Sequence, residues 1–144
     1  TYNRTDVQER VQDLVTVCAF AQTHSKGRRV ALCGSGRAGL WALLAAPASD
    51  ALAADCAQFD STLDTNLLAQ DLFAPGLRKI GAFEGVAALN TTHPLLLHNT
   101  GGKFTTGFLR KVYRGMHVPD AFREETAVLS EDAIASWLAK LQVR

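Results

Sequence analysis

The stretch RRVALCGSGRAGLWALL, residues 28–44, decides the fold. After two arginines, a short apolar run ends at Cys33, and glycines then recur through GSGRAG at residues 34–39. A short apolar run opened by charge and closed by glycine is typical of a buried strand. The run from Leu40 to Ala46 is almost wholly apolar, which is typical of a buried helix. The stretch therefore predicts a strand, a tight turn and a helix.

The sequence on either side extends this unit into an α/β domain. Upstream, apolar residues recur at three- and four-residue steps between residues 5 and 24, which predicts an amphipathic helix. Downstream, the sequence predicts strands at residues 55–60, 94–98 and 121–128, the last at a sheet edge, helices at 65–72, 85–89, 104–114 and 130–141, and a loop at 75–84. This alternation predicts a single α/β domain over residues 1–144, with a doubly wound, mainly parallel sheet and helices on both faces.

Composition and charge bear on the partners of the chain. With 144 residues, 47% of them hydrophobic, the chain has the size and apolar content of one globular domain. Its net charge of +1 does not provide the one-sided positive field that nucleic acid binding needs. No apolar run reaches the ~20 residues that span a bilayer. We therefore expect neither nucleic acid nor a membrane as a partner.

The cysteines and histidines do not predict a metal site. Cys18, Cys33 and Cys56 match no zinc spacing, and their odd number argues against a closed set of disulfides. We expect them to be buried free thiols, with Cys33 as the exception because it adjoins the glycine turn. The histidines also lack metal-ligand spacing. We expect no metal and no cofactor.

The glycine turn at residues 34–39 admits two interpretations. Ligands gather at the carboxyl ends of parallel strands, and the turn lies at such an end. As G-x-G-x-x-G, it would be a dinucleotide- or phosphate-binding module that uses Gly34, Gly36 and Gly39, with Arg37 as a further anion contact. A helix before the first strand weighs against this interpretation. So does Asp55, which follows Gly34 by 21 residues but opens the next predicted strand instead of closing it.

As G-x-S-x-G, the same residues form the nucleophile elbow of a hydrolase, with Gly34 and Ala38 as the flanking small residues. Residues 30–46 look like the elbow strand and helix of α/β-hydrolase-fold esterases, with the closest likeness to the acetyl xylan esterase-like and dienelactone hydrolase-like branch. The likeness extends to YNR at residues 2–4 with ERVQDL at 9–14 (the helix before the elbow), HPLLLHN at 93–99 (the later strand) and AIASWL at 133–138 (the closing helix).

The resemblance covers nearly the whole chain but only the C-terminal half of such a fold. It implies a partial domain whose open sheet edge is covered by a missing N-terminal half or by another copy, with a small ester or a carbohydrate as ligand. The catalytic positions that it implies are vacant, because Gly36 replaces the nucleophile, Asn99-Thr100-Gly101-Gly102 replaces the acid, and residues 127–130 contain no histidine. The resemblance thus implies a hydrolase-like domain without triad hydrolysis.

An active esterase with displaced residues stays open as an alternative, with Ser35 and His98 as its candidate pair. Structural roles compete with each candidate: Ser35 as a turn residue, Arg37 as a solvated or ion-paired side chain, and His98 as a hydrogen-bonded histidine. The loop at residues 99–103 could bind an anion through its backbone N–H groups. We expect a flexible surface turn there instead.

Overall fold

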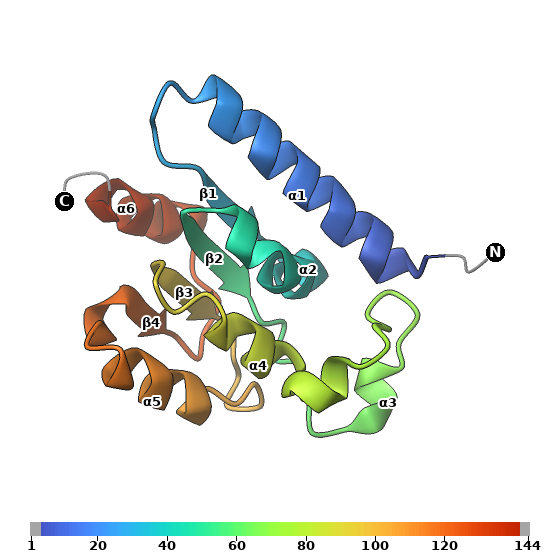
Figure 1. Ribbon diagram of the computed structural model, residues 1–144. Helices are drawn as coiled ribbons and strands as arrows, with labels where there is room; N and C mark the ends of the chain where they lie inside the picture. Colours follow the sequence, from blue (N-terminus) through green and yellow to red (C-terminus); the bar gives the residue numbers. More distant parts are fainter. Residues whose placement is uncertain (1–3, 142–144) are drawn as a thin grey trace.

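A computed structural model of the chain describes residues 4–141. Tyr2 and Asn3, which carry part of the hydrolase resemblance, lie outside these residues. Four parallel strands form a sheet in the sequential order β1-β2-β3-β4 (Figure 1). The predicted α/β class and its parallel sheet are confirmed. Of the helices within residues 4–141, none is long and apolar enough to cross a membrane.

The strands are β1 (Ala31–Gly34), β2 (Ala51–Asp55), β3 (Leu95–His98) and β4 (Phe122–Glu124). The α-helices are α1 (Asp6–His24), α2 (Arg37–Ala45), α3 (Asp64–Leu67), α4 (Ala82–Ala88), α5 (Gly107–Gly115) and α6 (Glu131–Leu141). Short 3-10 turns lie at Ala46–Ala48, Leu77–Ile80 and Pro119–Ala121.

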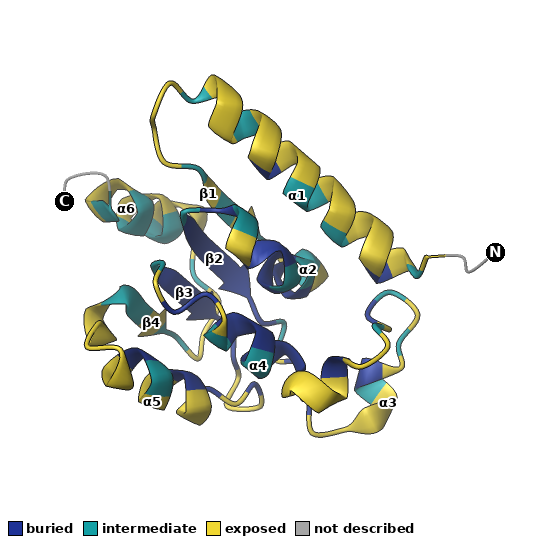
Figure 2. Ribbon diagram, viewed as in Figure 1, coloured by how far each residue is buried: buried dark blue, intermediate teal, exposed yellow. Residues whose placement is uncertain are grey.

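Helices cover the sheet on both faces. Right-handed crossovers between sequential parallel strands place the connecting helices on one face, where Figure 1 shows α2 and α4, with α1 packed along α2. Helix α6 follows β4 at one edge yet ends near β1 at the other, where Arg29 Nη1 donates to the carbonyl oxygen of Leu141 at 3.1 Å. It therefore crosses the opposite face. All residues of β2 and β3 are buried accordingly (Figure 2).

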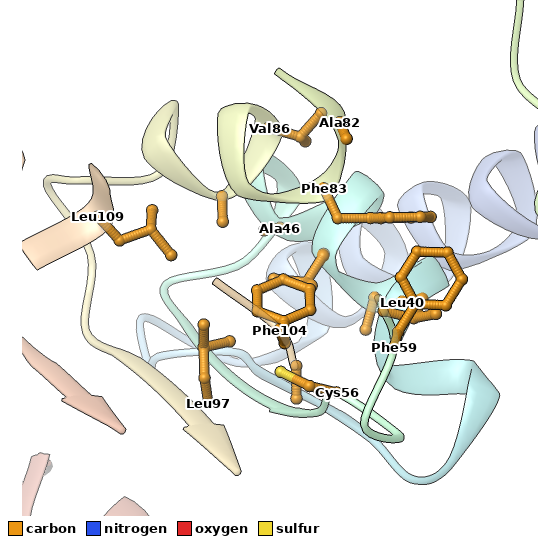
Figure 3. Close-up of a cluster of buried hydrophobic side chains, with 14 of the residues drawn as sticks. Leu40, Ala46, Cys56, Phe59, Ala82, Phe83, Val86, Leu97, Phe104 and Leu109 are labelled. Carbon is orange, nitrogen blue, oxygen red and sulfur yellow. The ribbon is translucent and has the colours of Figure 1, made fainter. Parts of the chain in front are cut away.

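The hydrophobic core lies between the sheet and helices α2, α4 and α5 (Figure 3). Leu40 from α2, Phe83 from α4 and Leu97 from β3 are fully buried in it. Phe59, in the segment after β2, packs edge-on against Phe83 with ring centroids 5.3 Å apart. This contact holds the segment after β2 against α4.

Strand β1 differs from its prediction as a buried strand. Ala31 and Cys33 are exposed, and Leu32 and Gly34 are half-buried. Among the described residues β1 pairs only with β2, so it is an edge strand, and α6 leaves part of its outer face open. Cys33 is therefore exposed, whereas Cys18 and Cys56 are buried as expected; all three are free thiols.

The second strand was misplaced by the sequence analysis. It spans Ala51–Asp55 and not residues 55–60. Its composition, largely alanine, has low β-propensity, and burial on both faces outweighs that preference. The predicted helix at residues 65–72 shrinks to α3, and α4 begins at Ala82 inside the predicted loop. Asp55 consequently closes a strand at the carboxyl edge of the sheet.

Helix ends follow the sequence more closely. Thr5 and Gln8 form the reciprocal capping pair at the start of α1, and the Ser130 hydroxyl accepts the Ala133 N–H at the start of α6. The apolar side chains of Ile134, Trp137 and Leu138 on α6 are all only half-buried.

Candidate functional site

The turn between β1 and α2 has the backbone of a strained strand-to-helix connection. Gly36 adopts φ 55° and ψ −136°, a combination that residues with side chains rarely adopt. Helix α2 begins at the next residue, Arg37. A Cβ atom built on Gly36 would meet no atom within 4 Å. The nucleophile position of the predicted elbow is therefore sterically open and carries no side chain.

The flanking glycines are required by close packing. A Cβ on Gly34 would lie 2.6 Å from the carbonyl oxygen of Ala38, and one on Gly39 would lie 2.0 Å from the carbonyl oxygen of Asp55. The first turn of α2 thus rests directly on the backbone at the end of β2. This explains the glycines at positions 34 and 39 without a ligand.

Asp55 is the polar centre of this edge, and the sequence analysis missed its role. It is buried, and its carboxylate accepts the Gly36 N–H at 3.0 Å, the Ala57 N–H at 2.7 Å and the Asn99 side-chain amide at 2.7 Å. One carboxylate therefore ties the ends of β1, β2 and β3 together. The 21-residue spacing from Gly34 was the signal, but the misplaced strand concealed it.

His98 closes β3 and pairs in register with Asp55 on β2. Its ring is buried, and Nδ1 lies 3.3 Å from the backbone N–H of Leu129. Nδ1 must be unprotonated to accept this bond, so the neutral ring carries its proton on Nε2. Burial lowers the pKa of His98, and the Asp55 carboxylate opposes part of this effect. His98 thus anchors the segment after β4.

The other candidates do not join His98. Ser35 is exposed in the turn, and β2 separates β1 from β3, which places their backbones about 10 Å apart. No hydrogen bond within residues 4–141 links Ser35 to His98. Arg37 makes a two-pronged ion pair with Asp71, with both N–O distances at 2.9 Å, and this pairing lowers the pKa of Asp71. Arg37 is therefore paired with Asp71 and is not free to bind an anionic ligand.

The loop after β3 is bound at its start and forms an exposed turn from Gly101 to Lys103, so it is a surface turn, as expected, and not a free anion cradle. The backbone N–H groups of Asn99, Thr100 and Gly101 donate to the carbonyl oxygens of residues 127, 125 and 126. Thr100 is also buried. These bonds attach the start of the loop to the segment after β4, and they use N–H groups that would otherwise be available to an anion.

Further carboxylates gather at the same edge of the sheet. Glu124 closes β4 and accepts hydrogen bonds from Thr106 and Arg110. Glu84, at the start of α4, accepts hydrogen bonds from Ser61 and Thr105. Burial raises the pKa of the Cys56 thiol, and the carboxylates of Asp55, Glu84 and Glu124 raise it further. These three carboxylates make this part of the edge electronegative. Glu84 and Glu124 belong to no sequence motif, so they could not be predicted as part of the site.

The edge does not form a metal centre or an enclosed cleft over the turn. Across the described part of the chain, no three His, Cys, Asp or Glu side chains come together as a metal site would require. Of five surface hollows in residues 4–141, one is lined by Glu84 and one by Glu124, and none of the five is lined by Gly36, Arg37 or His98.

Comparisons with protein-family models, with curated proteins and with solved structures gave no match.

Proposed function

We propose that this chain is a hydrolase-like α/β domain, related to carbohydrate or small-ester esterases, that does not hydrolyse esters through a triad and acts as a binding or assembly unit. The observation that carries the proposal is Gly36. Its backbone has the strained geometry of an elbow, yet the position that would bear the nucleophile has no side chain.

The neighbouring groups support the same conclusion. In a triad, a histidine must be free to take the nucleophile's proton, and an acid must orient that histidine. Here His98 is buried, and its Nδ1 accepts the N–H of Leu129. The carboxylate of Asp55 accepts hydrogen bonds from two backbone N–H groups and from Asn99. These groups hold the edge together and leave no acid–base pair for catalysis.

Assembly would use the open side of β1. Unpaired strand edges favour addition of another strand, and the exposed Ala31 and Cys33 lie on this strand. The partner would be the other half of such a fold or another copy of the chain.

One observation favours the dinucleotide alternative, because Asp55 lies at the end of β2, where the fingerprint expects an acid. Two others oppose it. Within residues 4–141 the strand order runs sequentially without a reversal, so these strands create no switch-point crevice. Asp55 also occupies the Gly36 N–H that a phosphate would use, and like charge would repel the phosphate. We therefore favour the hydrolase-like proposal.

Ester hydrolysis tests the proposal directly. We expect the purified chain to turn over p-nitrophenyl acetate no faster than its Ser35→Ala variant, and to resist labelling by a fluorophosphonate. Saturable turnover that the fluorophosphonate abolishes would refute the proposal, and loss of that turnover in Ser35→Ala would establish the displaced esterase. Heat released on titration with nicotinamide or flavin nucleotides would instead support the dinucleotide module.

The elbow geometry has its own test. Gly36→Ser should fold with a loss of about 1–3 kcal/mol, the cost of a side chain in strained backbone, because its Cβ has free space. The matched Gly34→Ser variant should be far less stable, because its Cβ would lie 2.6 Å from the Ala38 carbonyl oxygen. Urea unfolding compares the two, and an equal loss would contradict the elbow assignment.

A further inference from the structure

A hollow of about 450 Å³ opens beside the carboxyl edge of the sheet, away from the glycine turn. Its walls come from three separate segments: Ser61 after β2, residues 78–85 around the start of α4, and Thr105 with Phe108 at the start of α5. The volume lies in the range of sites that hold small organic ligands. The hollow therefore has the size and the mixed lining of a binding site.

Glu84 supplies the charge in this hollow. Its residue is only 6% exposed, and one carboxylate oxygen, Oε1, accepts hydrogen bonds from the hydroxyl of Ser61 and, at 2.9 Å, from that of Thr105. Within residues 4–141, no hydrogen bond reaches the second oxygen, Oε2, and no Lys, Arg or His lies within 4 Å of the carboxylate. Oε2 is not among the fully buried side-chain atoms that lack a hydrogen-bond partner, so it is open to solvent in the hollow and can accept a further donor.

The nearby cation does not fill this role. Arg78 lines the same hollow, but its guanidinium donates to the carbonyl oxygens of Ser61 and Thr62 and pairs with Asp64. These contacts hold the Arg78 guanidinium away from the Glu84 carboxylate, which therefore has no cationic partner among the described residues. A cation that enters from solvent would supply the missing partner.

The rim of the hollow is apolar and favours a cation that carries an apolar group. Ile80 and Phe108 are 56% and 57% exposed, respectively, and both line the opening. An aromatic face also attracts cations. Gly85 allows α4 to lie directly against the backbone of Ile80, because a Cβ at Gly85 would lie 1.7 Å from the carbonyl oxygen of Ile80.

We propose that this hollow binds a small organic cation, an amine or amidine on an apolar or aromatic body, with Glu84 as its counter-ion and Ile80 and Phe108 against its apolar part. The proposal does not depend on a relationship to hydrolases, because it uses none of the turn residues. The competing explanation is that Glu84 only stabilises the first turn of α4, where acidic residues are favoured.

Benzylamine tests this proposal, with benzyl alcohol as its neutral counterpart. The full chain, labelled with ¹⁵N, is titrated with each compound while amide chemical shifts are recorded. We expect saturable shifts for benzylamine at the amides of Ser61, Gly81, Gly85 and Thr105, and binding of benzyl alcohol at least tenfold weaker, since a charged hydrogen bond is lost. This comparison uses the unmodified protein, so it does not rest on the folding of any variant.

Two variants and a control complete the test. Glu84→Gln should weaken benzylamine binding about 10- to 100-fold, and Phe108→Ala, at an exposed position, should weaken it severalfold while the amide spectrum stays folded. Glu131→Gln removes an exposed charge at the start of α6, on the opposite face of the sheet, and should leave binding unchanged. No saturable shift with benzylamine, equal binding of the alcohol, or undiminished binding by a folded Glu84→Gln variant would overturn the proposal in favour of the helix-stabilising role.

Discussion

The contact between α2 and β2 makes Gly39→Ala a sharp test of the packing. A Cβ at this position would lie 2.0 Å from the Asp55 carbonyl oxygen and 2.7 Å from the Asp55 backbone nitrogen. Both neighbours are backbone atoms of a buried strand, so no side chain can rotate away. The helix must instead move off the sheet, and this movement also disturbs the bond from the Gly36 N–H to the Asp55 carboxylate.

The size of the effect follows from two opposing terms. Overpacking a close-packed interior typically costs about 1–3 kcal/mol and at times more, and a 2.0 Å approach is far inside the 3.4 Å of an ordinary contact. Replacing a helical glycine by alanine regains about 1 kcal/mol. We expect the free energy of unfolding to fall by about 2 kcal/mol, from the upper end of the first term less the second, which for a domain of this size lowers the melting temperature by roughly 4–8 °C.

Urea unfolding followed by circular dichroism measures this loss. Gly107→Ala is the matched control, because Gly107 opens α5 and its Cβ would meet nothing within 4 Å. That variant should be as stable as the wild type or more stable by up to about 1 kcal/mol. If Gly39→Ala unfolds at the wild-type urea concentration, α2 does not rest on β2 as described, and the structural explanation of the turn fails.

Two further predictions concern titratable side chains. Cys33 should be the one thiol that reacts with a maleimide reagent in the folded chain, whereas Cys18 and Cys56 should react after unfolding; labelling of Cys56 at the rate of Cys33 would contradict the described burial. Burial lowers the pKa of His98 below its usual 6.5. As the pH falls, the unfolded chain therefore binds a proton at this histidine before the folded chain does. The stability that comes from the neutral ring is present above about pH 6.5 and is lost below it. The Asn variant of His98, whose side-chain oxygen can still accept the Leu129 N–H, should lack this part of the slope between about pH 7 and pH 5, and equal slopes in pH-dependent urea unfolding would contradict the assignment.

The sequence predicts the strongly patterned elements well and the alanine-rich ones poorly. Helix α1 can be predicted from its apolar stripe and its Thr5 cap. Strand β3 can be predicted because Leu95–His98 is a short aliphatic run without a helical spacing. Strand β2 was misplaced because Ala51–Asp55 has no β-propensity to detect. Its conformation is imposed by burial between β1 and β3, which is a tertiary effect.

The candidate site could also be predicted from the sequence only in part. The turn at residues 34–39 could be found from sequence, since glycine is needed where backbone geometry is strained or atoms crowd. The partners of that turn could not. Asp55 lies 19 residues from Gly36 and Asn99 lies 44 residues from Asp55, and they meet because parallel strands end at a common edge. Glu84 belongs to no motif, and it is buried because the segments that carry Ser61 and Thr105 pack against α4.

The charges at this edge connect the two proposals. Asp55, Glu84 and Glu124 stand at or beside the ends of three strands, while Arg37 is held by Asp71 and Arg78 by Asp64. A site evolved for phosphates would present free cations and open N–H groups, whereas Arg37, Arg78 and the Gly36 N–H are already engaged. The same carboxylates would also disfavour the negative charge that develops when an ester is attacked. An edge with this electrostatics is suited to cations, so its ligand chemistry should be sought at Glu84 and not at the glycine turn.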